Sequence, residues 1–166
     1  MAGRAGRVVV VTPTERSIVE TLARILPAAA ASYEQCVFDF GGPRRSYRGV
    51  AHELREVLRE TLDYLAPDPD VMAEAGFRLE ANMTRPTQRQ KAIYILRKRR
   101  LSREQMSAPE LAVSLIEEMG ASITRSAYTR GARDAHTPTS EPEVRQLKMW
   151  VDAVLGELLE IHFHKV

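Results

Sequence analysis

The chain has 166 residues and a net charge of +2, with 44% hydrophobic and 28% charged residues. This length suits one domain with a sizeable core, and the balance of residues excludes a disordered chain. The single cysteine, Cys36, excludes an internal disulfide and a metal site built from several cysteines. No apolar stretch is long enough for a signal peptide or a transmembrane helix, so we expect a cytoplasmic protein without membrane attachment.

Helical signals dominate the first part of the chain. Thr12-Pro13-Thr14-Glu15 predicts a helix start, because threonine caps it, proline follows and glutamate lies three residues after the cap. Pro27 weakens this helix near its end, although the alanines that follow can extend it. Residues 32–45 are the least regular part, in which Cys36–Phe40 is expected to form a short strand or an extended loop. An amphipathic helix is expected from about Ser46 to Leu65.

The middle of the chain is predicted to contain one short and one longer helical segment. Asp68-Pro69 predicts a short helical turn, and residues 76–84 are expected to form a loop. A basic helix is then expected from Thr87 to about Leu101. The middle of the chain is therefore predicted to be mainly helical, like the first part.

The last part of the chain predicts two further helices. One runs from Pro109 to about Tyr128 and buries Leu111, and the capping pattern Ser140-Glu141-Pro142-Glu143 starts the other. The fold class is therefore expected to be an all-α bundle of about five helices. Residues 1–43 are expected to supply a helix and a loop that complete the bundle of residues 44–166.

The segment from Tyr128 to His136 carries side chains suited to phosphodiester chemistry. Arg130 has a planar fork of donors that fits a phosphate, and His136 can move protons near neutral pH. Cleavage of RNA without a metal needs a base for the 2′-hydroxyl proton and a cation for the charged phosphorane, and these are roles that His136 and Arg130 can fill. The alternative is a solvated surface loop in which Arg130 or Arg133 pairs with Asp134.

Two further groups of basic residues can contact nucleic acid. Arg48, His52 and Glu56 follow one another at i, i+4 spacing, so they share a helix face and can form a second polar wall of the site. A second group lies between residues 85 and 103, a segment without acidic residues, and suits contact with a phosphate backbone. Its central run is Arg97, Lys98, Arg99 and Arg100. For both groups the alternative is an ordinary solvated helix surface.

No metal or cofactor site is expected. His162 and His164 have no nearby set of carboxylate ligands and are assigned to a solvated helix end. The sequence contains no Walker loop, dinucleotide-binding glycine pattern or serine-nucleophile elbow. Ion pairs with neighbouring arginines explain, better than a two-metal site, the carboxylates of one helix: Glu53, Glu56, Glu60 and Asp63.

Several stretches resemble known families. Ser126–Gly131, followed by Asp134-Ala135-His136 and a capped helix, looks like the Arg-x(4–6)-His motif of HEPN domains. These are small helical domains, many of which are metal-independent ribonucleases in toxin–antitoxin and antiviral defence systems. Three stretches resemble parts of the bacterial proteins described as predicted pPIWI-associating nucleases: Tyr47–Glu56, Gln90–Leu96 and Trp150–Ile161. The resemblance covers roughly residues 44–161.

The resemblance implies a HEPN-like bundle and a homodimer in which Arg130 and His136 of both protomers line one cleft, with Asp134 beside them. The implied function is metal-independent cleavage of RNA in a bacterial defence or toxin system, with an antitoxin or another partner protein. Gly131 departs from the family, in which a polar residue often follows the motif arginine. One alternative is a non-catalytic helical module that binds nucleic acid or a partner protein. Another is a nuclease that uses a metal and the helix carboxylates.

Overall fold

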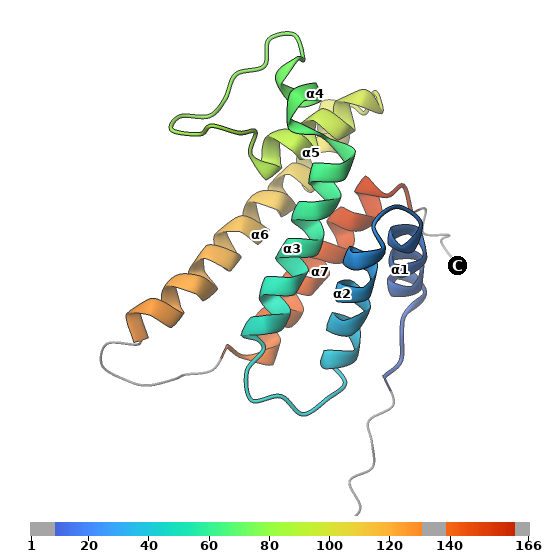
Figure 1. Ribbon diagram of the computed structural model, residues 1–166, viewed down its shortest axis with the longest axis vertical. Helices are drawn as coiled ribbons and strands as arrows, with labels where there is room; N and C mark the ends of the chain where they lie inside the picture. The colour runs from blue at the N-terminus through green and yellow to red at the C-terminus, as the bar shows by residue number, and fades with distance from the viewer. Residues whose placement is uncertain (1–8, 131–138, 162–166) are drawn as a thin grey trace, which may run out of the picture.

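The computed structural model describes residues 9–130 and 139–161, and of residues 123–130 it describes the backbone alone. Within these residues the chain forms seven α-helices and no strand (Figure 1). The helices are α1 (Pro13–Ile25), α2 (Pro27–Asp39), α3 (Arg48–Leu65), α4 (Asp68–Met72), α5 (Gln88–Lys98), α6 (Arg103–Arg130) and α7 (Glu141–Leu158). The all-α class is confirmed, whereas the expected number of about five helices is wrong.

The first difference is α2, which replaces the predicted strand or extended loop at Cys36–Phe40. The predicted start of α1 is confirmed, since the Thr12 hydroxyl accepts from Glu15 N–H and the Glu15 carboxylate accepts from Thr12 N–H. Helix α1 stops at Ile25, and Pro27 then occupies the first turn of a new helix, where its missing N–H costs nothing. Tyr33, Cys36 and Val37 are buried at helical spacing. Packing against the rest of the bundle therefore determines that this segment is a helix rather than a strand.

The second difference is α6, which begins at Arg103 rather than at Pro109. Pro109 lies inside this helix, where it removes one backbone hydrogen bond but is itself buried. The helix therefore continues through Pro109, although the local sequence pattern around this residue is typical of a helix start. Leu111, which was expected to be buried, is 60% exposed.

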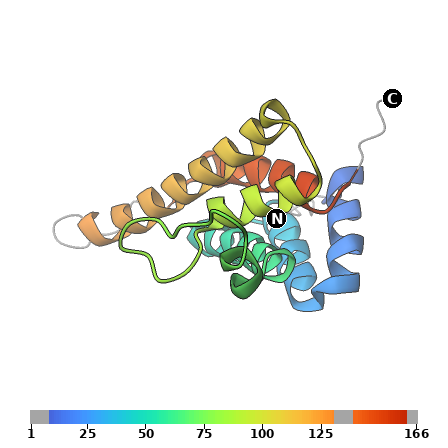
Figure 2. The same cartoon turned by 90° about the horizontal axis from the view of Figure 1, so that it is seen from above.

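Helix α3 lies at the centre of the bundle and contacts α2, α5, α6 and α7. Helices α1 and α2 pack on one side of the molecule and α6 lies on the other (Figure 2). Arg55 of α3 lies over Gly120 of α6 so closely that a Cβ there would be 2.2 Å from the Arg55 Nε atom. Among the described residues, no helix combines the length and apolar character needed to cross a membrane.

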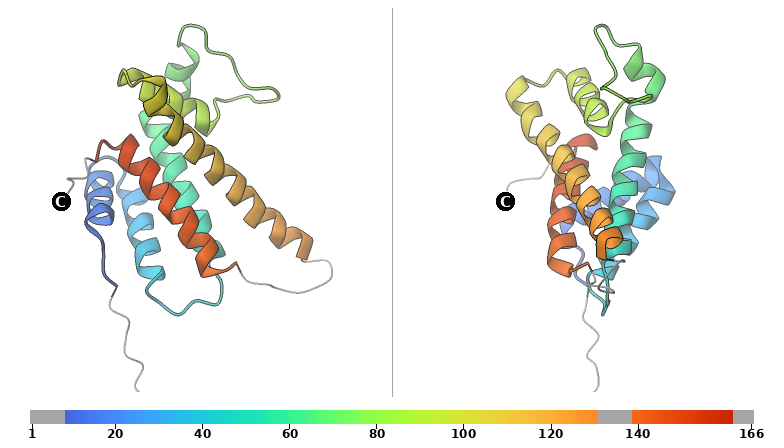
Figure 3. Two further views of the ribbon diagram at one scale, coloured as in Figure 1. Left: turned by 180° about the vertical axis from the view of Figure 1, so that it is seen from behind. Right: turned by 90° about the vertical axis from the view of Figure 1, so that its left-hand side faces the viewer.

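Each of the seven described helices contributes fully buried side chains, so they share one core. The largest of them are Ile18, Leu22, Tyr33, Leu54, Leu58, Leu62, Leu96, Ile116, Leu147, Leu155 and Leu158. The short helix α4 and the connection from 73 to 87 lie at one end of the bundle, and the connection from α2 to α3 lies at the opposite end (Figures 1 and 3).

A buried lysine joins α5 to the end of α3 and to α4. Lys91 is 2% exposed, and its Nζ atom lies 2.5 Å from both Asp63 Oδ1 and Asp68 Oδ1. Arg85 donates to the other oxygen of Asp68 at 2.6 Å, and Arg59 pairs with Asp63 at 3.1 Å. These partners satisfy the buried ammonium group, so we interpret the cluster as structural.

The pKa of Asp68 predicts an acid-dependent loss of stability. Hydrogen bonds from Arg85 and Lys91 hold this pKa below its ordinary value of 3.8. Because the folded value lies below the unfolded one, the Asp68 contribution is fully present above the ordinary value and is lost as the pH falls through the folded value. We expect the urea midpoint to drop less between about pH 6 and pH 3 in Asp68→Asn than in the wild type.

The matched control is Asp70→Asn, because Asp70 is exposed on the same helix and forms no ion pair with a described residue. This variant should show the full drop of the wild type. An equal drop in all three proteins would contradict the role of Asp68.

Candidate functional site

The predicted catalytic residues fall at the edge of what the structure describes. Helix α6 ends at Arg130, but the side chain of Arg130 and the whole of Asp134 and His136 lie outside the described residues. The chain is described again from Thr139, and the predicted start of α7 is confirmed. The Glu143 carboxylate accepts from the Ser140 N–H at 3.1 Å and from the Ser140 hydroxyl at 3.0 Å.

The end of α6 and the beginning of α7 lie at the same end of the bundle as the α2–α3 connection (Figure 3). A hydrogen bond of 3.2 Å from Tyr47 N–H to the Thr139 carbonyl joins this connection to the segment before α7. The Tyr47 hydroxyl also lies 3.4 Å from a carboxylate oxygen of Glu141, and its ring stacks on Phe40. Tyr47 therefore places the first turn of α3 beside the segment that leads into α7.

Burial, together with the neighbouring Glu141 carboxylate, raises the pKa of Tyr47 above its ordinary value. The hydroxyl thus stays protonated near neutral pH and can donate a hydrogen bond. This keeps the link between the α2–α3 connection and α7 intact at physiological pH.

Arg48 and His52 extend from the first two turns of α3. Both are exposed, as is expected for a face off the apolar stripe, and neither side chain has a hydrogen bond or an ion pair with a described residue. Glu56, the third residue of this face, pairs instead with Arg59 at 2.7 Å. The cation of Arg48 and the imidazole of His52 are therefore available to an anionic ligand.

Arg44 and Arg45 are two further cations at this end that were not predicted from the sequence. Arg44 Nη1 donates to Asp39 Oδ2 at 2.5 Å, whereas Arg45 is exposed and has no ion pair with a described residue. The signal that could have found them is an arginine pair that directly follows the turn Gly41-Gly42-Pro43. Together with Arg48, these residues make this end of the bundle basic.

The predicted basic run from Arg97 to Arg100 lies at the other end. It falls between the end of α5 and the start of α6, and α6 has 28 residues, so its two ends are about 42 Å apart. Arg99 donates to the carbonyls of Glu157 and Leu158 and pairs with Glu160 at 3.4 Å. Its guanidinium group therefore caps the end of α7.

The other three residues of the run are exposed. The Lys98 ammonium lies 4.6 Å from the centroid of the Tyr94 ring, and Arg97 reaches Glu74 only at 4.0 Å. Arg100 adopts a positive φ of 56° at the end of α5. Arg97, Lys98 and Arg100 thus form an exposed basic corner, but within one chain this corner is far from Arg130.

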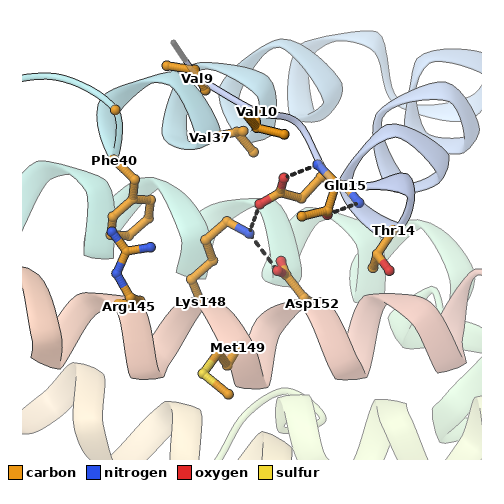
Figure 4. A pocket seen from close by; sticks show the side chains of 12 residues that line it. Val9, Val10, Thr14, Glu15, Val37, Phe40, Arg145, Lys148, Met149 and Asp152 are labelled. Atoms are coloured by element: carbon orange, nitrogen blue, oxygen red, sulfur yellow. Dashed lines mark hydrogen bonds and ion pairs between the residues drawn. The ribbon is translucent and has the colours of Figure 1, made fainter. Parts of the chain in front are cut away.

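A cavity of about 650 Å³ lies between the segment before α1, the end of α2 and the middle of α7 (Figure 4). Its polar wall is an ion network that sequence reasoning missed, although a lysine between the inward positions Leu147 and Val151 was a visible signal. Lys148 Nζ lies 2.5 Å from both Glu15 Oε1 and Asp152 Oδ2. Tyr33 donates to the second oxygen of Asp152 at 2.6 Å.

The members of this network satisfy one another. Burial tends to raise the pKa of Glu15, but hydrogen bonds from Lys148 and Thr12 hold it below its ordinary value. Burial raises the pKa of Asp152, against the opposing effect of Lys148 and Tyr33. Because both oxygens of each carboxylate have partners, we interpret the network as a structural link between α1, α2 and α7.

A second hollow, of about 520 Å³, lies between α2 and α3 and includes His52. In the described part of the chain, no three histidine, cysteine, aspartate or glutamate residues are grouped so that they could hold a metal ion. Glu56 and Asp63 form ion pairs with Arg59, as predicted from the sequence of this helix.

Comparison with known proteins gives one match. A family model described as predicted pPIWI-associating nuclease matches residues 31–155. These residues include most of α2, all of α3 to α6 and most of α7. No curated protein and no solved structure matches the chain significantly.

Proposed function

Because the chain belongs to the family of predicted pPIWI-associating nucleases, we propose that it is a metal-independent RNA endonuclease of a bacterial defence or toxin system. Arg130 and His136 carry the chemistry in this proposal, with Asp134 beside them. The protein acts in the cytoplasm as a homodimer whose cleft contains these residues from both protomers, under the control of an antitoxin or another partner protein.

The observation that supports this proposal best is the hydrogen bond from Tyr47 to Thr139. It brings the first turn of α3 to the segment that follows residues 131–138, so Arg48 and His52 lie at the end of the bundle where α6 stops and α7 begins. In this proposal Arg48 and His52, which have no ion pair with a described residue, form a second wall beside the catalytic residues. A cation and an imidazole there would stabilise the negative charge of a phosphodiester substrate.

The proposed reaction is transesterification within the RNA. His136 takes the proton from a 2′-hydroxyl, the 2′-oxygen attacks the adjacent phosphorus, and Arg130 stabilises the charge on the phosphorane. The bond from phosphorus to the 5′-oxygen breaks, and this oxygen takes up a proton. The products are an RNA with a 2′,3′-cyclic phosphate and an RNA with a 5′-hydroxyl group.

The basic corner of Arg97, Lys98 and Arg100 has a separate role in this proposal. It is about 42 Å from Arg130 along α6, so within one protomer it cannot contact the phosphate that is cut. It holds the RNA backbone farther along the strand. Arg99 contributes less, because its guanidinium group already binds the end of α7.

A second candidate function is a non-catalytic module that binds RNA or a partner protein. The exposed basic corner favours it, since phosphate contacts bind nucleic acid without any chemistry. Gly131 also favours it, because a polar residue often follows the motif arginine in the HEPN domains that this segment resembles. The two candidates differ in whether the protein cuts RNA.

The test is cleavage of a labelled single-stranded RNA in the presence of EDTA. We expect cleavage to continue and its product to carry a 2′,3′-cyclic phosphate, whereas a substrate with 2′-deoxyribose throughout should stay intact. Cleavage of the deoxy substrate at the same rate, or loss of activity with EDTA, would contradict the mechanism. RNA binding that weakens steeply with salt, without any cleavage, would support the binding module instead.

A further inference from the structure

The hollow between α2 and α3 has the size of a ligand site, and several polar side chains stand along its wall. Its volume of about 520 Å³ lies in the range of small-molecule pockets. Gln35 and Asp39 line it from α2, and His52 and Glu53 line it from α3. Arg44, from the connection between these helices, completes a wall of opposite charges.

The two carboxylates of this hollow differ in what they can still bind. Asp39 Oδ1 accepts from Gln35 at 3.0 Å, and Asp39 Oδ2 accepts from Arg44 at 2.5 Å. Glu53 is exposed and has no hydrogen bond or ion pair with a described residue. The Glu53 carboxylate is therefore the acceptor that remains available to a ligand.

Gly49 lines the same hollow, and the packing of the protein does not require a glycine there. It lies in the first turn of α3, and no atom outside its own helix lies within 4 Å of the position that a Cβ would take. Glycine in a helix costs stability relative to alanine, and a helical glycine is expected where another molecule approaches the backbone closely. The space beside Gly49 is therefore open to a ligand in the hollow.

From these contacts we infer that the hollow binds a guanine base of the RNA substrate, next to the phosphate that is cut. Guanine presents two adjacent donors, N1–H and the N2 amino group, on its Watson–Crick edge, and these match the two oxygens of the Glu53 carboxylate. The other three bases lack this pair of donors. Sequence-specific proteins read unstacked RNA bases by such edge contacts. That the ligand is RNA rests on the proposed function.

His52 connects the hollow to the proposed catalytic end. His52 lines the hollow. It also lies one turn after Arg48 on the exposed face of α3 that is proposed to contact the substrate. A base held by Glu53 would therefore leave its phosphate near Arg48 and Arg44. The hollow would make the cleavage selective for a position beside guanosine.

The test measures binding of short 2′-O-methyl uridine oligomers in which one central base is G, A, C or U. These probes cannot be cleaved through a 2′-hydroxyl, so the result is independent of catalysis. The wild type should bind the G oligomer at least about tenfold more tightly than the others. Glu53→Gln should reduce this preference to less than about twofold, because its amide group presents a donor to the guanine amino group.

The matched control is Glu34→Gln, which makes the same change at an exposed position of α2 outside the hollow and should keep the preference. Gly49→Leu should weaken binding of the G oligomer at least about tenfold, and its thermal unfolding should not occur at a lower temperature, because open space surrounds the new side chain. If Gly49→Leu does not fold, the comparison of Glu53→Gln with Glu34→Gln still tests whether Glu53 binds guanine.

Equal binding of the four oligomers by the wild type, or an unchanged preference in Glu53→Gln, would overturn the inference. Cleavage of RNA without any preference for guanosine would do the same and leave the proposed nuclease function intact. Selective binding of the G oligomer by a protein that never cuts RNA would keep the inference and remove the nuclease function.

Discussion

His136→Ala should reduce the rate of RNA cleavage by about 100- to 10,000-fold, which is the usual contribution of a general acid or base. The structure ends α6 at Arg130 and starts α7 at Glu141, and the hydrogen bond from Tyr47 N–H to the Thr139 carbonyl joins the start of α3 to the segment before α7. RNA binding and the urea midpoint should stay close to those of the wild type. Single-turnover cleavage, anisotropy binding and urea unfolding measure the three quantities.

The control for this variant is His164→Ala, which changes a histidine that the sequence analysis assigns to a solvated helix end. It should cleave RNA at the rate of the wild type. A rate of His136→Ala within about threefold of the wild type would rule out His136 as the general base, whatever the fold of the variant.

Mixing two inactive variants tests the shared cleft. Arg130→Ala and His136→Ala homodimers should each be inactive, but a mixed dimer contains one wild-type arginine and one wild-type histidine from different protomers. If the two protomers build one cleft, mixing should restore part of the activity. Mixed dimers that form and remain inactive would contradict the composite site.

The elements that could be predicted from the sequence are those with local signals. Thr12 and Ser140 each begin a helix, as their capping patterns indicated, because the stabilising bonds join residues only three positions apart. Helix α2 could not be predicted in the same way. The apolar run at Cys36–Phe40 also fits a strand, and its helical form depends on packing against distant residues.

Pro109 is a second position at which the local sequence pattern does not predict the structure. Its local pattern indicates a helix start, yet α6 begins six residues earlier because the extended helix packs against α5 and α7. Helical stability in proteins comes mostly from such packing, so local rules place elements better than they place their ends.

The candidate site could be predicted only where residues lie on one helix. Arg48 and His52 share an exposed face because i, i+4 spacing fixes it. The hydrogen bond from Tyr47 to Thr139 joins residues far apart in the chain, and no pattern in the sequence predicts it. The same is true of Arg99, whose partners are the carbonyls at the end of α7.

Lys148→Met should lower the free energy of unfolding by about 3–5 kcal/mol, the usual cost of removing one partner from a buried ion pair. The side chains of Lys148 and Glu15 are only 9% and 12% exposed, and Asp152 is nearly as buried. Without the ammonium group, two carboxylates would face each other in a region shielded from water. Urea unfolding followed by circular dichroism measures the loss.

The control is Lys98→Met, which makes the same change at an exposed lysine and should leave the urea midpoint unchanged. The double variant Lys148→Met with Asp152→Asn should be less destabilised than Lys148→Met alone, because the unpaired carboxylate is then neutral. A double variant that is destabilised by the sum of its two single changes would show that the residues do not act as one network. Such additivity would leave the junction of α1, α2 and α7 to apolar packing alone.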